Sequence, residues 1–116
     1  MAVEMTMARF EELVSDALDT IPARFAAAMS NVVVLVEDIH PDNPHLLGLY
    51  HGVSLTNRTS YYSGVLPDRI TIYRRPILRL CRTEDDVVTQ VRVTVLHEVG
   101  HHFGLDDETL HELGWG

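Results

Sequence analysis

The sequence predicts a compact α+β domain, on the strength of three observations. An amphipathic helix opens the chain, β-branched and alternating segments follow in the middle, and a long helix dominates the C-terminal third. We expect the N-terminal helices and the long helix to pack on a small, mixed or mostly antiparallel sheet of about three to four strands. The length of 116 residues suits a single domain over residues 1–116.

The first third of the chain is expected to form two helices and a strand. Apolar residues recur at helical spacing over residues 5–20, which predicts an amphipathic helix. Pro22 interrupts this pattern and suits the first turn of a short second helix over residues 23–29. The continuous β-branched run over residues 32–36 predicts a buried strand.

The middle of the chain is rich in turn residues, and short extended pieces within residues 47–55 are expected to pair in hairpins. Alternation over residues 69–74 predicts a further strand, and Pro76 then begins a helical turn that reaches Leu80.

The long helix is expected to begin at Thr83, because Thr83 and Asp86 resemble a capping box. Gly104 is a suitable end for this helix, and residues 107–113 predict one or two further helical turns. The apolar face of the long helix is expected at Val88, Val91, Val95, Val99 and Phe103.

Charge and composition exclude several classes of function. The chain has 9 Lys and Arg against 17 Asp and Glu, a formal net charge of -8, so binding of nucleic acid through bulk charge is not expected. All the cations are arginine, which excludes a P-loop lysine and a Schiff-base lysine. No apolar run approaches the roughly 20 residues that span a bilayer, so no membrane partner is expected.

The compartment is predicted from two further features. No basic segment followed by an apolar one opens the chain, so we expect no secretory signal. Cys81 is the single cysteine, which excludes both an intrachain disulfide and a cysteine-rich zinc site. A reducing, cytoplasmic location is the simplest interpretation.

Seven histidines are many for a chain of this length, and two of them carry the strongest functional signal. His97 and His101 are four residues apart on the long helix, so both imidazoles project from one side and can bind one zinc ion. Glu98 lies about 100° further round the helix, beside the metal, where its carboxylate can accept a proton from water. The same polar flank of the helix is expected to include Gln90 and Thr94 and to face a cleft.

A third metal ligand is expected just after the helix. Gly104 lets the chain turn back, and Asp107 follows His101 closely enough to reach the metal, with Asp106 as the alternative. Gly100 is expected on the cleft side, where a missing Cβ allows a ligand or strand to approach. His102 is expected to point away from the metal and to pack or to support the site.

The motif HExxHxxGxxD resembles the zincins, with aspartate in place of the usual third histidine. The fuller resemblance is to the small bacterial minimal zincin metallopeptidase-like family, through segments like residues 48–55, 64–76 and 97–104. It implies a minimal zincin fold, with His97, His101 and Asp107 as ligands of one Zn²⁺, or of another divalent ion, and Glu98 as the catalytic carboxylate. The four methionines all precede the motif, so a Met-turn below the metal is not expected.

Two hypotheses about function follow. The first is a zinc-dependent metallopeptidase that hydrolyses peptide or protein substrates with a metal-activated water and with Glu98 as general base and acid. The strand at residues 69–73 would then pair with an extended substrate. The second is a metal-stabilised binding module with little or no hydrolysis. Donors for the oxyanion of the first hypothesis are expected among Tyr50, His51, Tyr61, Tyr62, Tyr73 and His111.

Overall fold

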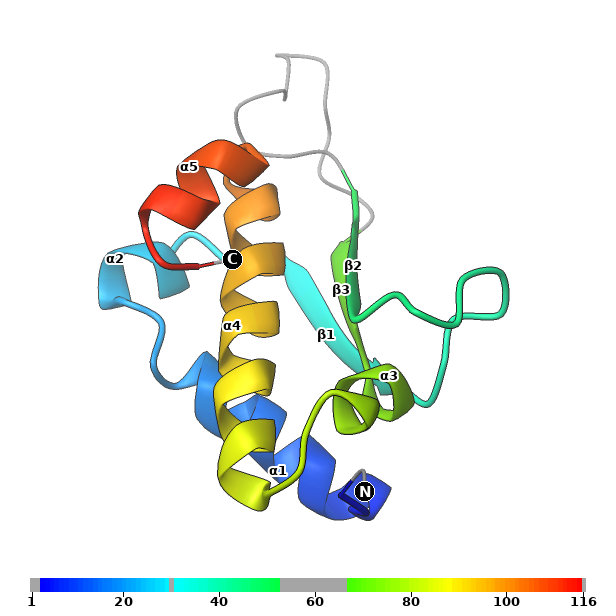
Figure 1. Ribbon diagram of the computed structural model, residues 1–116. Coiled ribbons are helices and arrows are strands. Elements are labelled where there is room, and N and C mark those ends of the chain that lie inside the picture. The colour runs from blue at the N-terminus through cyan, green and yellow to red at the C-terminus, as the bar shows by residue number, and fades with distance from the viewer. Residues whose placement is uncertain (1–2, 30, 53–66, 116) are drawn as a thin grey trace.

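The computed structural model describes residues 3–29, 31–52 and 67–115, which form helices packed against one small sheet (Figure 1). The N-terminal helix α1 covers Met7–Leu18, and the short helix α2 covers Ala23–Ala26. The sheet contains β1 (Val32–Glu37), β2 (Gly48–His51) and β3 (Asp68–Tyr73). The helices α3 (Arg74–Arg79), α4 (Glu84–His102) and α5 (Asp107–Glu112) follow. The predicted α+β architecture of a minimal zincin is confirmed.

The sheet is mixed, with the strand order β1-β3-β2. β1 pairs parallel to β3, with Val34 opposite Ile70, and β2 pairs antiparallel to β3, with Tyr50 opposite Ile70. β3 is therefore the central strand, and its side chains are almost all buried. Of the extended pieces expected within residues 47–55, residues 53–55 lie outside the described residues, as do residues 56–66.

β1 is an edge strand, and the prediction of a buried strand over residues 32–36 is wrong, because these residues are alternately partly buried and exposed. Val32, Val34 and Val36 pack against the core, whereas Val33 and Leu35 are 39% and 40% exposed. A continuous apolar run predicts burial on both faces of a strand, but the described helices cover only one face of this sheet (Figure 1).

The long helix α4 packs against both α1 and the sheet, and its packing corrects one predicted residue. Thr83 and Asp86 form the expected capping box at its N-terminus. Its buried stripe begins at Val87, which is fully buried, and continues through Val91, Val95 and Val99, whereas Val88 is 44% exposed. Residues 87 and 88 both lie at helical spacing from Val91, so periodicity alone did not distinguish them.

The two neighbouring valines allow a direct test of this helical register. Val87→Ala is expected to lower the free energy of unfolding by about 2 kcal/mol, because it leaves a cavity in the core. Val88→Ala, the matched variant on the exposed side, is expected to change it by less than about 0.5 kcal/mol. Urea denaturation of both variants measures the difference, and equal losses would contradict the observed register.

Candidate metal and active site

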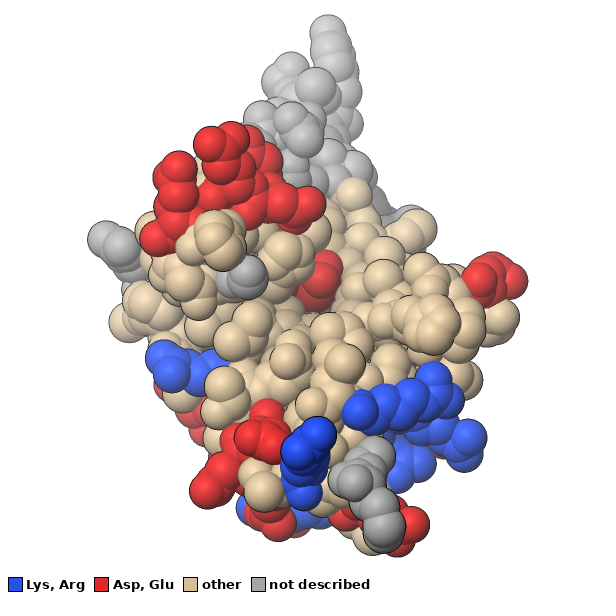
Figure 2. All heavy atoms as spheres, viewed as in Figure 1, with Lys and Arg blue, Asp and Glu red and all other residues tan. Residues whose placement is uncertain are grey.

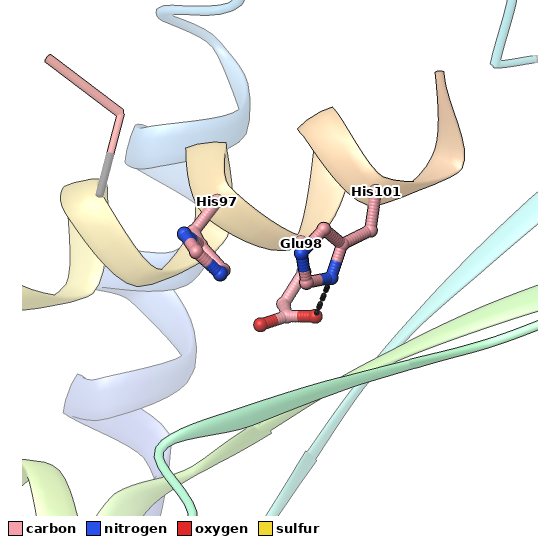
Figure 3. A group of neighbouring side chains, drawn as sticks. All are labelled: His97, Glu98 and His101. Carbon is pink, nitrogen blue, oxygen red and sulfur yellow. Dashed lines mark ion pairs between the residues drawn. The ribbon is translucent and has the colours of Figure 1, made fainter. Parts of the chain in front are cut away.

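The C-terminal half of α4 carries the predicted metal-binding residues on the side that faces the sheet (Figure 3). The rings of His97 and His101 lie with their centroids 4.6 Å apart, because four residues make slightly more than one helical turn. One donor atom from each of His97, Glu98 and His101 lies within 4.8 Å of the others, so these three residues form a group that could hold a metal ion.

α5 brings the predicted third ligand to the same place. Gly104 turns the chain with φ 78°, a left-handed conformation that favours glycine, directly after α4. The Asp106 side chain caps α5 by accepting a hydrogen bond from the Thr109 backbone N–H at 2.8 Å. Asp107 then points back at the imidazoles, with Oδ1 3.3 Å from His97 Nε2 and 3.0 Å from His101 Nε2. The geometry thus favours Asp107 over Asp106.

These separations fit a divalent ion such as Zn²⁺. In a tetrahedral site with zinc–ligand bonds of about 2.0–2.1 Å, two donor atoms lie about 3.3 Å apart. The distances from Asp107 Oδ1 to the two Nε2 atoms are close to this value. His101 Nδ1 lies 3.3 Å from Glu98 Oε1 on the other side of the ring, so Glu98 and Asp107 approach this imidazole through different nitrogens.

Glu98 is a carboxylate held almost out of contact with water, with 6% of its surface exposed. Burial raises the pKa of its carboxyl group above the usual value. The nearby charges of His101 and His97, and hydrogen bonds from the His101 ring and the Tyr50 backbone N–H, oppose this rise in the pKa. A carboxyl group with a raised pKa suits a general base that works near neutral pH.

A cavity of ≈ 290 Å³ opens beside Glu98, and the predicted polar flank of α4 forms one of its walls. The opposite wall includes Leu46, Leu47 and Gly48, which the sequence analysis did not assign to the site. Gly48 allows this close approach, because a Cβ at that position would lie 2.9 Å from Thr94 Cγ2. A glycine within an expected extended segment is the sequence feature that points to this close approach. The cavity is lined by Leu46, Leu47, Gly48, Gln90, Val93, Thr94, His97 and Glu98.

A family model described as zincin-like metallopeptidase matches residues 29–115. The chain belongs to this family. A solved structure of a conserved hypothetical protein from Thermus thermophilus is also similar, with 25% sequence identity and a TM-score of 0.56. The match covers 94% of this chain and 97% of that one. No curated protein is significantly similar to the chain.

Membership of the zincin-like family supports zinc as the metal, while the roles of single residues stay predictions. The family implies a zinc cofactor, and the group at His97, Glu98 and His101 could bind it. The assignments of His97, His101 and Asp107 as ligands, and of Glu98 as the catalytic carboxylate, rest on the motif and on the distances given above.

Two expectations for this zincin-like site are wrong. Gly100 faces α5 rather than the cleft, because a Cβ on Gly100 would overlap Leu110 Cδ2. The strand at residues 69–73 cannot pair with a substrate, because β3 already has β1 and β2 on its two edges. The periodicity of the sequence predicts the helix α4 and the strand β3, but not which elements pack beside them.

Only some of the expected oxyanion donors lie among the residues that the structure describes. Tyr61 and Tyr62 lie outside the described residues. The Tyr50 hydroxyl donates to Asp68 Oδ2 at 2.7 Å and is therefore already engaged. The Tyr73 side chain is buried, and burial raises the pKa of its hydroxyl. His51 and His111 are exposed.

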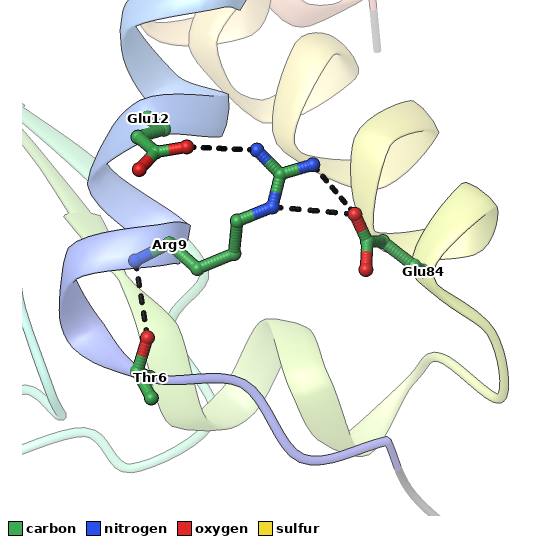
Figure 4. Close-up of polar contacts among 4 residues, drawn as sticks. All are labelled: Thr6, Arg9, Glu12 and Glu84. Carbon is green, nitrogen blue, oxygen red and sulfur yellow. Dashed lines mark hydrogen bonds and ion pairs between the residues drawn. The ribbon is translucent and has the colours of Figure 1, made fainter.

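Figure 4 shows how the opposite end of α4 is anchored to α1. Arg9 on α1 donates to Glu84 Oε1 from Nη2 at 2.6 Å and from Nε at 3.2 Å, and it also pairs with Glu12. These groups are solvent-exposed, so they orient the two helices more than they stabilise them. The core contacts between α1 and α4 supply most of the stability.

The contact between Gly100 and Leu110 predicts a link between packing and metal binding. Gly100→Ala is expected to displace α5, which carries Asp107, and so to weaken zinc binding by about tenfold or more. Gly114→Ala is the control for backbone strain without a steric clash. The φ of 76° disfavours a side chain at Gly114, as any added Cβ would experience, but nothing lies within 4 Å of that Cβ. Competition with a chromophoric chelator measures both affinities. Unchanged zinc affinity in Gly100→Ala would show that the position of α5 does not affect the metal site.

The raised pKa of Glu98 predicts that the stability of the metal-free protein decreases as the pH rises. Its folded-state pKa exceeds the unfolded value, so its contribution to stability is present below the unfolded pKa and is lost as pH rises through the folded pKa. Glu98→Gln removes the buried charge and is expected to melt a few degrees higher than the wild type at pH 7. The difference in melting temperature between Glu98→Gln and the wild type should vanish near pH 4. A lower melting temperature of Glu98→Gln than of the wild type at pH 7 would contradict the raised pKa of Glu98.

Proposed function

We propose that the protein is a zinc-dependent peptidase that cleaves peptides or exposed protein segments. The observation that carries the proposal is the buried carboxylate of Glu98 beside two imidazoles that share the oxygen of a third residue, Asp107. A purely structural metal site does not need a further carboxylate with a raised pKa at this position.

Each of the site residues would have a separate task. His97, His101 and Asp107 would hold the ion, and zinc, when bound, would polarise the substrate carbonyl and increase the acidity of water. Glu98 would accept a proton from the attacking water and pass it to the leaving amine. Its burial keeps bulk water away from this proton transfer, which strengthens the electrostatic interactions within the site.

The cavity beside Glu98 supports a preference for an apolar side chain next to the scissile bond. Leu46, Leu47 and Val93 are apolar residues of its lining, while Gln90 and Thr94 supply polar groups. β2 is the edge strand that borders this cavity, through Gly48, so an extended peptide would run along β2 rather than along β3.

One observation favours the alternative of a metal-stabilised binding module. The hydroxyl group of Tyr50 donates to Asp68, so it does not supply the oxyanion donor without rearrangement. A module of this kind would gain stability from zinc and bind peptides without cleaving them.

Substitution of Glu98 distinguishes the two functions. Glu98→Ala is expected to keep its zinc, by elemental analysis, and to lose peptide cleavage by at least about 100-fold, because the proton acceptor is gone. Glu108→Ala, which removes an exposed carboxylate from α5, should retain both properties. His97→Ala should lose both the zinc and the activity. Cleavage of a diverse peptide library, followed by mass spectrometry with and without a chelator, is the measurement.

Turnover by Glu98→Ala at the wild-type rate would refute the mechanism. Binding of library peptides by the zinc-loaded wild type, with no cleavage of any of them, would instead establish the binding module.

A further inference from the structure

Asp68 is a buried carboxylate to which the sequence analysis assigned no role. It begins β3, is 1% exposed, and receives two hydrogen bonds on one oxygen. The Tyr50 hydroxyl donates to Asp68 Oδ2 at 2.7 Å, and His102 Nδ1 lies 2.8 Å from the same atom. With Asp68 ionised, its carboxylate only accepts hydrogen bonds, and His102 would then carry its proton on Nδ1.

His102 is a costly residue for this position unless its bond to Asp68 has a purpose. Its ring is 1% exposed, and Nε2 has no hydrogen-bond partner among the described residues. An apolar side chain would fill the same space without leaving a buried nitrogen unsatisfied. The bond from Nδ1 to Asp68 is therefore the feature that explains an imidazole here.

These contacts form a closed circuit that includes Glu98. The Tyr50 backbone N–H faces the Glu98 carboxylate closely enough to lower its pKa, and the Tyr50 side chain donates to Asp68. Asp68 binds His102, which lies one helical turn beyond Glu98 on α4. The circuit thus passes from α4 to β2, to β3 and back to α4. It binds β2 to the helix at the level of the catalytic carboxylate.

Two glycines let β2 come close enough for this circuit. A Cβ on Gly48 would lie 3.1 Å from Glu98 Cγ, and a Cβ on Gly52 would contact the Asp68 carboxyl group at 2.5 Å. Gly48 lies on the same side of β2 as Tyr50, because side chains alternate along a strand, and Gly52 follows directly after the end of β2. The local sequence is therefore adapted to hold Tyr50 between the helix and the central strand.

We propose that Tyr50, Asp68 and His102 form a positioning network that holds the Tyr50 backbone N–H against Glu98 and thereby orients this carboxylate. The network does not include the nitrogen atoms that face Asp107, so it acts on proton transfer rather than on metal binding. Its catalytic consequence rests on the proposed peptidase function, but the positioning itself does not.

Amide hydrogen exchange tests the positioning without any activity measurement. Tyr50→Phe removes one hydroxyl, and the amide of residue 50 is expected to exchange about tenfold faster, because its contact with Glu98 is no longer held. Asp68→Asn should change the same amide in the same direction, since a neutral amide oxygen accepts more weakly than a carboxylate. The Asp68 variant also tests the His102 contact without removing a ring from the core.

Tyr73→Phe is the matched control. Tyr73 is also buried and lies on the adjacent strand, but its ring contacts His40, outside the network. This variant should leave exchange at residue 50 unchanged. The proposal is overturned if Tyr50→Phe and Asp68→Asn leave exchange at residue 50 as in the wild type, or if Tyr73→Phe accelerates it equally.

Kinetics supply the second readout. In the zinc-loaded protein, Tyr50→Phe is expected to lower kcat about tenfold, with KM and zinc content unchanged, because substrate and metal contacts remain. Equal turnover in Tyr50→Phe and wild type would overturn the catalytic part of the proposal. If the wild type itself cleaves no peptide, the peptidase function fails, and the exchange measurement alone decides whether the network exists.

Discussion

The rotation of α4 about its own axis determines which surroundings each functional side chain meets. Val87, Val91, Val95 and Val99 recur every four residues and are buried. With this stripe in the core, His97 and His101 emerge at the rim, partly exposed, while Glu98 turns toward the sheet and is buried. A shift of one residue would rotate the helix by about 100° and exchange these environments. The valine packing that stabilises the domain therefore also orients the site.

The return of the chain after α4 supplies what one helix cannot. Two histidines one turn apart present two donors, and a third must come from another element. Gly104 reverses the chain, Asp106 begins α5 by capping it, and Leu110 packs against the bare backbone at Gly100. Asp107 reaches both Nε2 atoms from an exposed position because α5 is docked in this way.

Charge is distributed unevenly around this centre. Acidic side chains gather over α5, at the upper left of Figure 2, and arginines gather near α3, at the lower right. Asp106 and Asp107 make the entrance to the metal site negative, which favours the approach of cations. No helix within the described residues is long and apolar enough to span a bilayer.

The carboxylates of Glu98 and Asp68 are both buried, but their surroundings suit different roles. Glu98 accepts hydrogen bonds but keeps a raised pKa because burial outweighs them, and it borders a cavity. Asp68 is more deeply buried and binds Tyr50 and His102 directly. The first arrangement suits a group that exchanges protons, and the second suits a group that holds neighbouring elements in place.

The sequence by itself determined the helices, the zinc motif and the family, because these depend on local spacing. Residues 97–101 place two imidazoles on one helical side wherever the helix lies, and Thr83 with Asp86 caps it using only its own first turn. Local spacing also indicates Asp107 as a candidate metal ligand, because it follows the turn at Gly104.

Only the tertiary structure decided which partner each of these elements meets. It placed Val87 rather than Val88 in the core, Leu110 against Gly100, and β3 between two neighbours. It also joined Tyr50, Asp68 and His102, which are far apart in the chain. Such contacts depend on strand order and helix docking, and these are set by the packing of the whole core rather than by the periodicity of any one segment.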